Sequence, residues 1–469
     1  MPGTARFGAT WRRVAQLPAS LAMPSAVAPL PLEPAPSRHA APPAGVPGVD
    51  RPLRVALLTY RGNPYCGGQG VYTRQLSRAL ARLGHEVEVL SGQPYPEIDD
   101  GVSFTPVPSL DLYRQPDPFR IPHWREFRDP IDALEFGVMC TAGFPEPLTF
   151  SLRAWRMLRA RAGDFDLVHD NQCLGYGILG IARDVAPVIG TIHHPITVDR
   201  SLDLAHAPSL RKRLSLQRWY GFTRMQVRVA RRIPRILTPS PTSRRDIAAA
   251  FGIPESRMAT VTLGVDTEAF RPVPQVSRIP GRIITTASAD VPLKGLSNLI
   301  RALATLRSTH PDAHLVVIGK PREESRTTRL IRDLGLLGAV QFRSGLDEEQ
   351  IAELYAQAEV AVVPSLYEGF SLPAVEAMAS GVALLTTRGG ALPDVVGEDG
   401  EAGMLVDSGD PEALRVALVR LLDDELLRHR LAAGGRRRAL ERFSWEATAR
   451  ATVAEYVGFL SPAAARSAC

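Results

Sequence analysis

Residues 53–90 read LRVALLTYRGNPYCGGQGVYTRQLSRALARLGHEVEVL, and this stretch decides the fold. The apolar run at 53–59 predicts a buried strand, and a glycine-rich loop follows it at 62–70. Apolar residues then recur at helical spacing over 71–83, and a glycine ends the pattern. Because 85–90 has a second strand pattern, the stretch predicts a strand–loop–helix–strand unit with two parallel strands.

Strand and helix patterns continue to alternate on both sides of a proline-bearing segment at 270–280, which we interpret as an interdomain linker. Before it, strands are expected at 166–169, 188–193 and 235–238, and a strand and turn at 260–266. After it, strands are expected at 282–287, 314–318, 340–342, 360–363 and 383–386, and helices at 293–306, 322–334, 348–358, 372–379 and from 411 to about 460. This series predicts two doubly wound α/β domains, which bind ligands beyond the carboxyl ends of their strands.

The predicted organisation has four parts. Residues 1–50 are rich in Ala and Pro, and we expect disorder there because they cannot bury enough apolar surface. A signal peptide is disfavoured because Gln16 and Pro18 interrupt the apolar run at 14–23. Residues 51–270 and 271–445 are the two predicted α/β domains, and 446–469 is a predicted helix that packs back toward the first domain.

The composition is that of an ordinary globular protein: of 469 residues, 45% are hydrophobic and 22% are charged. No apolar run approaches about 18 residues, so no membrane-spanning helix is expected. The four cysteines are scattered without a CxxC pair, which disfavours disulfides and zinc and favours a cytoplasmic location. The net charge of +6 indicates a general affinity for anions.

The segment PSLYEGFSLPAVE carries two glutamates, Glu368 and Glu376, which are separated by seven residues. The first lies in the loop after a predicted strand, and the second lies about one turn into a helix whose N-cap we expect at Ser371. Gly369 permits close approach of a ligand, and the amides around Phe370 at the helix start can hold a diphosphate. Carboxylates at such a place accept hydrogen bonds from sugar hydroxyls.

This segment resembles the E-x7-E signature of family 4 retaining glycosyltransferases. The resemblance assigns contact with the transferred sugar to Glu368 and contact with the donor ribose to Glu376. Four further segments also resemble the family, and we interpret the first two as structural only: 239–243, 263–266, 378–382 and 389–394.

The resemblance spans roughly residues 53–460 and implies the GT-B fold. In that α/β fold, two tandem Rossmann-like domains enclose a donor cleft between them. Residues 51–270 are then the acceptor domain, and 271–445 the domain that binds the nucleotide sugar.

The segment DVPLKGL at 290–296 resembles the R-x5-K-G element with which the family neutralises the donor diphosphate. Lys294 matches the lysine, and it is one of only three lysines among 55 basic residues. Ser288 stands where the family usually has arginine. Either Ser288 and nearby amides compensate for the lost cation, or the donor binds differently.

The segment PYCGGQGVY at 64–72 resembles the family's Gly-Gly loop, so Gly67 and Gly68 are predicted to contact the donor. A dinucleotide-binding loop is the alternative. Thr73 replaces its third glycine, and the next strand does not end on the acid that would bind a ribose. These departures disfavour a dehydrogenase.

The segment GTIHHP at 190–195 ends a predicted strand. The resemblance assigns a catalytic role near the donor sugar to His193, with His194 left as an alternative. A metal site would need a third ligand, which is not apparent nearby. A D-x-D pair, Asp164 and Asp166, precedes its strand instead of following one. We therefore predict an enzyme without a metal or other cofactor.

The stretch 207–235 indicates a further partner. No acidic residue occurs between Asp203 and Asp246, while arginines and one lysine cluster there with the apolar residues Leu210, Trp219, Phe222 and Met225. Peripheral contact with an anionic inner membrane face and a solvated, arginine-rich helix face are equally compatible with this pattern.

The sequence therefore predicts a cytoplasmic glycosyltransferase that moves a hexose-type sugar, with retention, from a UDP- or GDP-linked donor. The acceptor is a glycan, a lipid or a small molecule, and the loops at 95–147 are expected to select it. A catalytically impaired scaffold, which only Ser288 supports, and a nucleotide-sugar epimerase are the alternatives. No nucleic-acid motif is present, so nucleic acid is not an expected partner.

Overall fold

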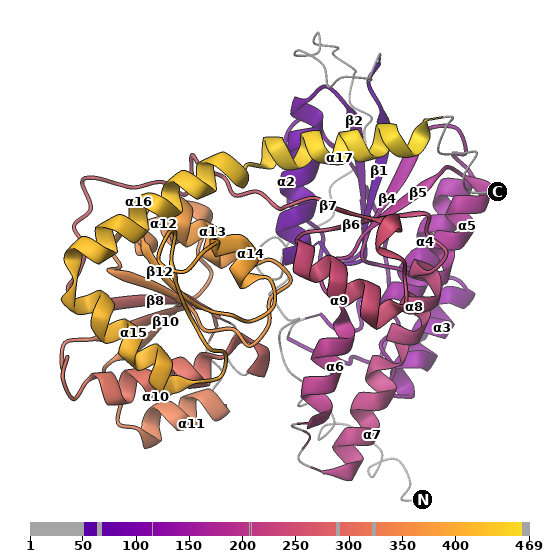
Figure 1. Ribbon diagram of the computed structural model, residues 1–469. Coiled ribbons are helices and arrows are strands. Elements are labelled where there is room, and N and C mark those ends of the chain that lie inside the picture. Colours follow the sequence, from indigo (N-terminus) through magenta and orange to yellow (C-terminus); the bar gives the residue numbers. More distant parts are fainter. Residues whose placement is uncertain are drawn as a thin grey trace, which may run out of the picture. The chain divides into compact units, whose positions relative to one another are not determined.

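The computed structural model describes residues 51–62, 68–114, 116–205, 207, 209–287, 291–320 and 325–461 (Figure 1). The predicted tail at 1–50 and the predicted donor-binding residues Gly67 and Ser288 lie outside these ranges. The chain divides into two compact units: unit 1 is Met1–Gly190 with Ala207–Ile233, and unit 2 is Thr191–His206 with Pro234–Cys469. The domain limits expected from the sequence stay a prediction.

The first sheet has seven strands in the order β3-β2-β1-β4-β5-β6-β7. Its strands are β1 (Arg54–Thr59), β2 (Glu86–Ser91), β3 (Ser103–Pro106), β4 (Leu167–Asn171), β5 (Val188–Thr191), β6 (Arg235–Thr238) and β7 (Met258–Thr260). The central strand β1 runs parallel to β2 and β4, with Val55 level with Val87 and Leu167. Val55 is buried, as the apolar run predicted, and Val87 and Leu167 are buried as well.

The helices connected to this sheet are α2 (Gly68–Arg82), α3 (Pro130–Cys140), α4 (Glu146–Arg159), α5 (Tyr176–Asp184), α6 (Ile196–Ala205), α7 (Leu210–Trp219), α8 (Thr223–Ala230) and α9 (Pro241–Phe251). Local sequence sets their ends. Asp129 caps α3 with a capping box, and Ser240 caps α9, in which Pro241 is the first residue.

The second sheet has six strands in the order β10-β9-β8-β11-β12-β13. Its strands are β8 (Arg282–Thr286), β9 (His314–Ile318), β10 (Val340–Arg343), β11 (Val360–Val363), β12 (Ala383–Thr387) and β13 (Met404–Val406). The central strand β8 runs parallel to both β9 and β11. Its Ile283 belongs to a large buried aliphatic core that also holds Leu299, Leu315 and Val362.

The second sheet is flanked by α10 (Leu296–Leu306), α11 (Arg326–Asp333), α12 (Glu348–Ala356), α13 (Leu372–Ala379), α14 (Leu392–Val396), α15 (Pro411–Asp423) and α16 (Glu425–Arg442), and α17 (Trp445–Leu460) follows them. Within unit 2, α17 contacts the segment after β7, because Thr448 donates to the Thr262 carbonyl at 2.8 Å. None of the described helices is long and apolar enough to cross a membrane.

The strand of the strand and turn predicted at 260–266 lies earlier in the chain than expected. The sheet strand β7 ends at Thr260, and the residues after it leave the sheet until Val265 forms a single parallel bridge with Ser444. Two short edge strands, β3 and β13, were missed because edge strands this short carry little periodicity. The helix predicted from 293 begins at Leu296, because Gly295 adopts a left-handed conformation.

Candidate functional site

The loop from β11 into α13 holds both predicted glutamates. Ser371 is the N-cap of α13, as predicted, and its Oγ accepts a hydrogen bond from the Ala374 amide at 3.4 Å. Its φ of 103° is uncommon for a residue with a side chain. Backbone strain of this kind concentrates at functional sites, because the surrounding structure has to maintain it.

Glu368 lies in this loop and is bound by two side chains. Lys294 Nζ lies 2.8 Å from Oε1 and 3.1 Å from Oε2, and Ser365 Oγ donates to Oε1 at 2.7 Å. The Glu368 side chain is 11% exposed and that of Lys294 is 33% exposed. The structure therefore brings together the predicted sugar-binding acid and the predicted diphosphate-binding cation.

The backbone explains why these two residues meet. Lys294 ends a short 3₁₀ turn, and Gly295 follows with a φ of 64°. A Cβ at Gly295 would lie 1.9 Å from the Pro364 carbonyl oxygen, so only glycine fits there. The Leu366 amide donates to the Leu293 carbonyl at 2.7 Å. The loops after β8 and β11 are thus joined side by side at the carboxyl edge of the second sheet.

Glu376 lies one turn into α13 and is half-buried. Burial raises the pKa of its carboxyl from 4.5 to about 7, the charge of Glu348 adds to this, and the Tyr355 hydroxyl acts in the opposite direction. Glu348 and Tyr355 both belong to α12, which packs against the start of α13 through a 3.4 Å contact from Tyr355 Oη to the Pro373 carbonyl. Glu376 is therefore poised between its neutral and charged forms near neutral pH.

Gly369 and Phe370 contribute through their backbone. A Cβ at Gly369 would lie 2.3 Å from the His193 carbonyl oxygen. The sequence predicted that a ligand approaches this glycine closely, but in the structure the backbone at His193 does so. The Phe370 ring is buried and packs edge-on against Phe443, with centroids 5.5 Å apart. The Phe370 side chain thus anchors the loop and leaves only its amide to face a ligand.

The predicted histidines follow β5, in the part of unit 2 that reaches this loop. The imidazole of His194 is paired with Asp199, at 2.9 Å between Nε2 and Oδ2. Both histidine side chains are half-buried. Because the His193 carbonyl lies against Gly369, the segment that carries His193 and the loop that carries Glu368 are neighbours.

The predicted donor-binding residue Gly68 lies at the first position of α2, in unit 1. Sequence reasoning missed contacts made by α9, whose first residues it interpreted as structural. Ser240 and Ser243 both donate to the Gly369 carbonyl, and Asp246 accepts from the Tyr367 hydroxyl at 2.8 Å. In the sequence, only the position of the serine hydroxyls directly after a predicted strand could have indicated that α9 makes these contacts.

No cluster of three or more His, Cys, Asp or Glu side chains suited to a metal occurs among the described residues. The D-x-D acid Asp166 binds Arg51 and Arg54 at 2.8 and 3.1 Å, and these arginines hold the pKa of its carboxyl well below the usual range. It precedes β4, as expected, and it also accepts a hydrogen bond at 2.8 Å from the amide of Arg54, the first residue of β1.

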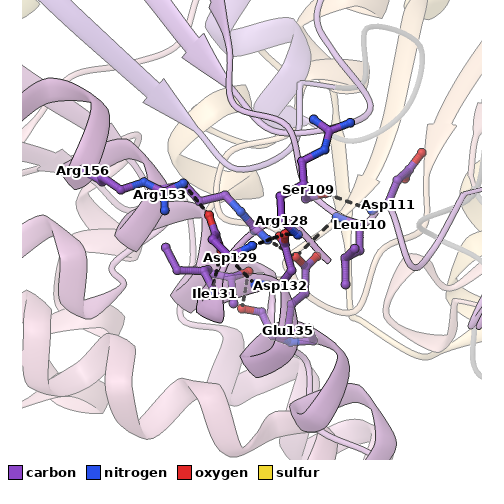
Figure 2. A network of polar contacts seen from close by, with 12 residues as sticks. Ser109, Leu110, Asp111, Arg128, Asp129, Ile131, Asp132, Glu135, Arg153 and Arg156 are labelled. Atoms are coloured by element: carbon purple, nitrogen blue, oxygen red, sulfur yellow. Dashed lines mark hydrogen bonds and ion pairs between the residues drawn. The ribbon is translucent and has the colours of Figure 1, made fainter. Parts of the chain in front are cut away.

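A buried ionic network orders the loops that were expected to select an acceptor (Figure 2). Arg153 of α4 donates to Asp132 at 2.6 Å and to Glu135 at 2.5 Å, and both acids belong to α3. Glu135 also accepts from the Leu110 amide at 3.4 Å, which ties the loop after β3 to α3. Burial raises the pKa of the Glu135 carboxyl.

The described part of the basic stretch at 207–235 forms α7, a short 3₁₀ turn and α8. Trp219 and Phe222 pack into an aromatic cluster with Tyr113 and Phe144, and Met225 is buried. These three side chains therefore cover unit 1's own core, and the membrane contact stays a prediction. Exposed apolar side chains in the described part of this stretch are Leu210 and Leu214, at 80% and 66%.

Two family descriptions match this chain. Residues 66–269 match "Glycosyltransferase Family 4", and residues 274–438 match "Glycosyl transferases group 1". The two matches cover the segments in which the motifs occur.

Curated proteins and solved structures are similar over nearly the same span. The MMP alpha-(1->4)-mannosyltransferase of Mycolicibacterium hassiacum is 55% identical over 405 residues, 86% of this chain and 98% of that protein. The D-inositol 3-phosphate glycosyltransferase 2 of Catenulispora acidiphila is 30% identical over 434 residues, 86% of this chain and 95% of that protein. Sucrose-phosphate synthase from Thermosynechococcus elongatus superposes with a TM-score of 0.67 at 24% identity, covering 87% of this chain and 99% of that chain. This last likeness confirms the predicted fold class.

Proposed function

Because the chain belongs to the group 1 glycosyltransferases, we propose that it is a retaining mannosyltransferase that forms α-(1→4) linkages from a nucleotide-diphosphate mannose. The observation that carries this proposal is the 55% identity with a protein named as an α-(1→4)-mannosyltransferase, over 98% of that protein. The acceptor is then a sugar whose 4-hydroxyl receives the mannosyl residue.

The site supports this proposal through charge and position. Lys294 lies at the carboxyl edge of the second sheet, where its ammonium neutralises the donor diphosphate. Glu368 accepts hydrogen bonds from hydroxyls of the transferred sugar, and Glu376 accepts from the donor ribose. His193 lies beside the same loop, near the place where the sugar would bind.

Retention follows if the acceptor attacks the face from which the diphosphate leaves. The bond from C1 of the sugar to the β-phosphate oxygen breaks, and the bond from C1 to the acceptor oxygen forms on the same face. The acceptor's proton passes to the departing phosphate oxygen, so atoms and charge balance without a protein nucleophile. The protein's contribution is then to hold both substrates and to stabilise the charge on the leaving group.

We propose that this chemistry needs no metal ion, because the Lys294 ammonium and the amides at the start of α13 supply positive charge at the diphosphate. We also propose peripheral contact of α7 with anionic lipid. Leu210 and Leu214 lie on one helix face and are exposed, with Arg211, Arg213 and Arg218 on the same helix.

The test is a transfer assay with mannose and glucose donors, each linked to GDP or UDP, and with short α-(1→4)-linked manno-oligosaccharides as acceptors. We expect mannosyl transfer that is unaffected by EDTA, and NMR of the product should show a new α-(1→4) linkage. Transfer of glucose alone, or a β-anomer, would overturn the proposed specificity or retention. Sugar isomerisation without an acceptor would favour the epimerase alternative, and no turnover with any donor would favour a scaffold.

A further inference from the structure

Two buried hydroxyls converge on a single carbonyl in the middle of the proposed donor loop. Ser240 Oγ donates to the Gly369 carbonyl at 2.8 Å, and Ser243 Oγ donates to the same oxygen at 2.7 Å. The serines are 1% and 0% exposed, and they lie 129 and 126 residues from Gly369 in the sequence. All three residues belong to unit 2.

The two serines are not equivalent. Ser240 is the N-cap of α9, so its oxygen also accepts from the Ser243 amide at 3.0 Å. Ser243 has no capping role. Its hydroxyl lies 2.7 Å from the Gly369 carbonyl and 3.3 Å from the His193 carbonyl, so it spans two segments that carry proposed catalytic residues.

The position of the carbonyl matters for the chemistry. Gly369 follows Glu368 directly, so fixing its peptide plane limits the directions in which the carboxylate can point. The same peptide unit carries the Phe370 amide, which has no acceptor within the described ranges. Hydrogen bonds into a carbonyl polarise its peptide group and strengthen the amide at the other end as a donor.

Two more contacts from α9 hold the same region. Asp246 accepts from the Tyr367 hydroxyl at 2.8 Å, and the Thr242 amide donates to Asp394 Oδ2 at 2.8 Å. The first half of α9 therefore contacts the donor loop on both sides of Glu368 and also reaches α14. A buried serine that only needed a hydrogen-bond acceptor would bond to the nearest carbonyl. It would not explain why several residues of α9 contact the same loop.

We propose that Ser240 and Ser243 are positioning residues for sugar transfer. Their hydroxyls fix the Gly369 peptide, and through it they set the Glu368 carboxylate and the Phe370 amide relative to the His193 segment. Neither serine contacts the donor in this proposal. The inference rests on the proposed transferase function, since the quantity that it predicts is the rate of transfer.

The clean variant is Ser243→Ala, because it removes one donor and leaves the cap of α9 intact. Steady-state transfer is measured for this variant and for the double variant Ser240→Ala with Ser243→Ala. It is also measured for Ser243→Thr and Ser240→Thr, which keep the hydroxyl, and in the second case the cap of α9 as well. The matched control is Thr452→Val, which removes a buried hydroxyl that donates to a helix carbonyl in α17 at 2.8 Å. Thermal midpoints of all variants accompany the kinetics.

We expect Ser243→Ala to lower kcat on the order of tenfold, the size of one lost hydrogen bond, with less than a threefold change in the donor KM. Ser243→Thr and Ser240→Thr should stay within about threefold of the wild type. The double variant should lose more kcat than Ser243→Ala alone, because it also removes the second donor to the Gly369 carbonyl. Thr452→Val should have a similar thermal midpoint to Ser243→Ala and a normal kcat.

The proposal is overturned if Ser243→Ala keeps a kcat within twofold of the wild type. It is also overturned if Thr452→Val loses as much kcat as Ser243→Ala, since the effect would then follow general stability. Failure of the transferase function itself is seen separately, as a wild-type protein that transfers no sugar from any donor.

Discussion

The ammonium of Lys294 lies 2.8 Å from one carboxylate oxygen of Glu368 and 3.1 Å from the other. The cation proposed for the donor diphosphate and the acid proposed for the sugar are thus partners of one another. We propose that a bound donor competes with this contact, so that binding of the nucleotide part and placement of the sugar are coupled through one ion pair.

Replacing Glu368 with Gln should separate these two roles. The ammonium of Lys294 would lose its charged partner and become more available to phosphate, so we expect tighter binding of free nucleoside diphosphate, by about threefold to tenfold. Transfer should fall by about 100-fold or more, because the sugar loses a charged acceptor. Isothermal titration calorimetry and initial rates measure the two effects, and weaker nucleotide binding by Glu368→Gln would contradict the proposed exchange of partners.

Replacing Lys294 with Ala should weaken nucleotide binding and slow transfer together. The diphosphate would lose a close cation in a partly buried site, and we expect about a tenfold to 100-fold loss of affinity. Lys320→Ala is the matched control, because it removes one of the other two lysines from an exposed position after β9. Equal losses in both variants would show that net charge, and not the position of Lys294, controls donor binding.

The pKa of Glu376, raised to about 7, predicts that donor binding depends on pH. The ribose hydroxyls donate to a carboxylate better than to a neutral acid, so affinity should increase by several-fold between pH 6 and pH 8. The measurement is the nucleotide dissociation constant against pH in the wild type and in Glu376→Gln. A wild-type profile as flat as that of Glu376→Gln would mean that Glu376 does not titrate in this range.

The same carboxyl predicts a pH dependence of stability. Since the folded state raises its pKa from 4.5 to about 7, the folded state binds the proton more tightly than the unfolded state does. Its contribution to the free energy of unfolding is complete below about pH 4.5 and is lost as the pH rises through about 7. Urea unfolding at several pH values should show a shallower decline between pH 5 and pH 8 for Glu376→Gln than for the wild type.

Gly369→Ala should destabilise the protein by about 2–4 kcal/mol, because its Cβ would lie 2.3 Å from the His193 carbonyl oxygen. Gly458→Ala is the matched control, since a Cβ in that α17 position has nothing within 4 Å and favours helix. Chemical unfolding of both variants tests the close contact. A stability for Gly369→Ala equal to that of the control would mean that the His193 segment does not press against this loop.

Leu210→Ser combined with Leu214→Ser should abolish binding of the protein to anionic vesicles in a flotation assay, if α7 inserts both side chains. Both residues are exposed, so this double variant should keep the thermal midpoint of the wild type. Absence of salt-sensitive flotation in the wild-type protein would rule out the membrane contact and leave a solvated helix face.

Local sequence predicted much of the architecture and part of the site. The apolar run at 53–59, the N-cap Ser371 and the position of Glu376 one turn into a helix depend on a few adjacent residues, and the structure confirms them. The strand and turn predicted at 260–266 were placed too late for the opposite reason. The sheet strand ends at Thr260, and Val265 bonds with the distant Phe443 and Ser444 instead of with the sheet.

The sequence by itself determined the alternation of strands and helices and placed Glu368 and Lys294 in loops after strands, because periodicity and capping act between neighbouring residues. Only the tertiary structure decided that these two side chains meet, that two serines more than 120 residues away hold the Gly369 carbonyl, and that Trp219 faces inward. Burial and hydrogen-bond partners depend on which distant segments pack together. A one-dimensional pattern of residue types does not contain that information.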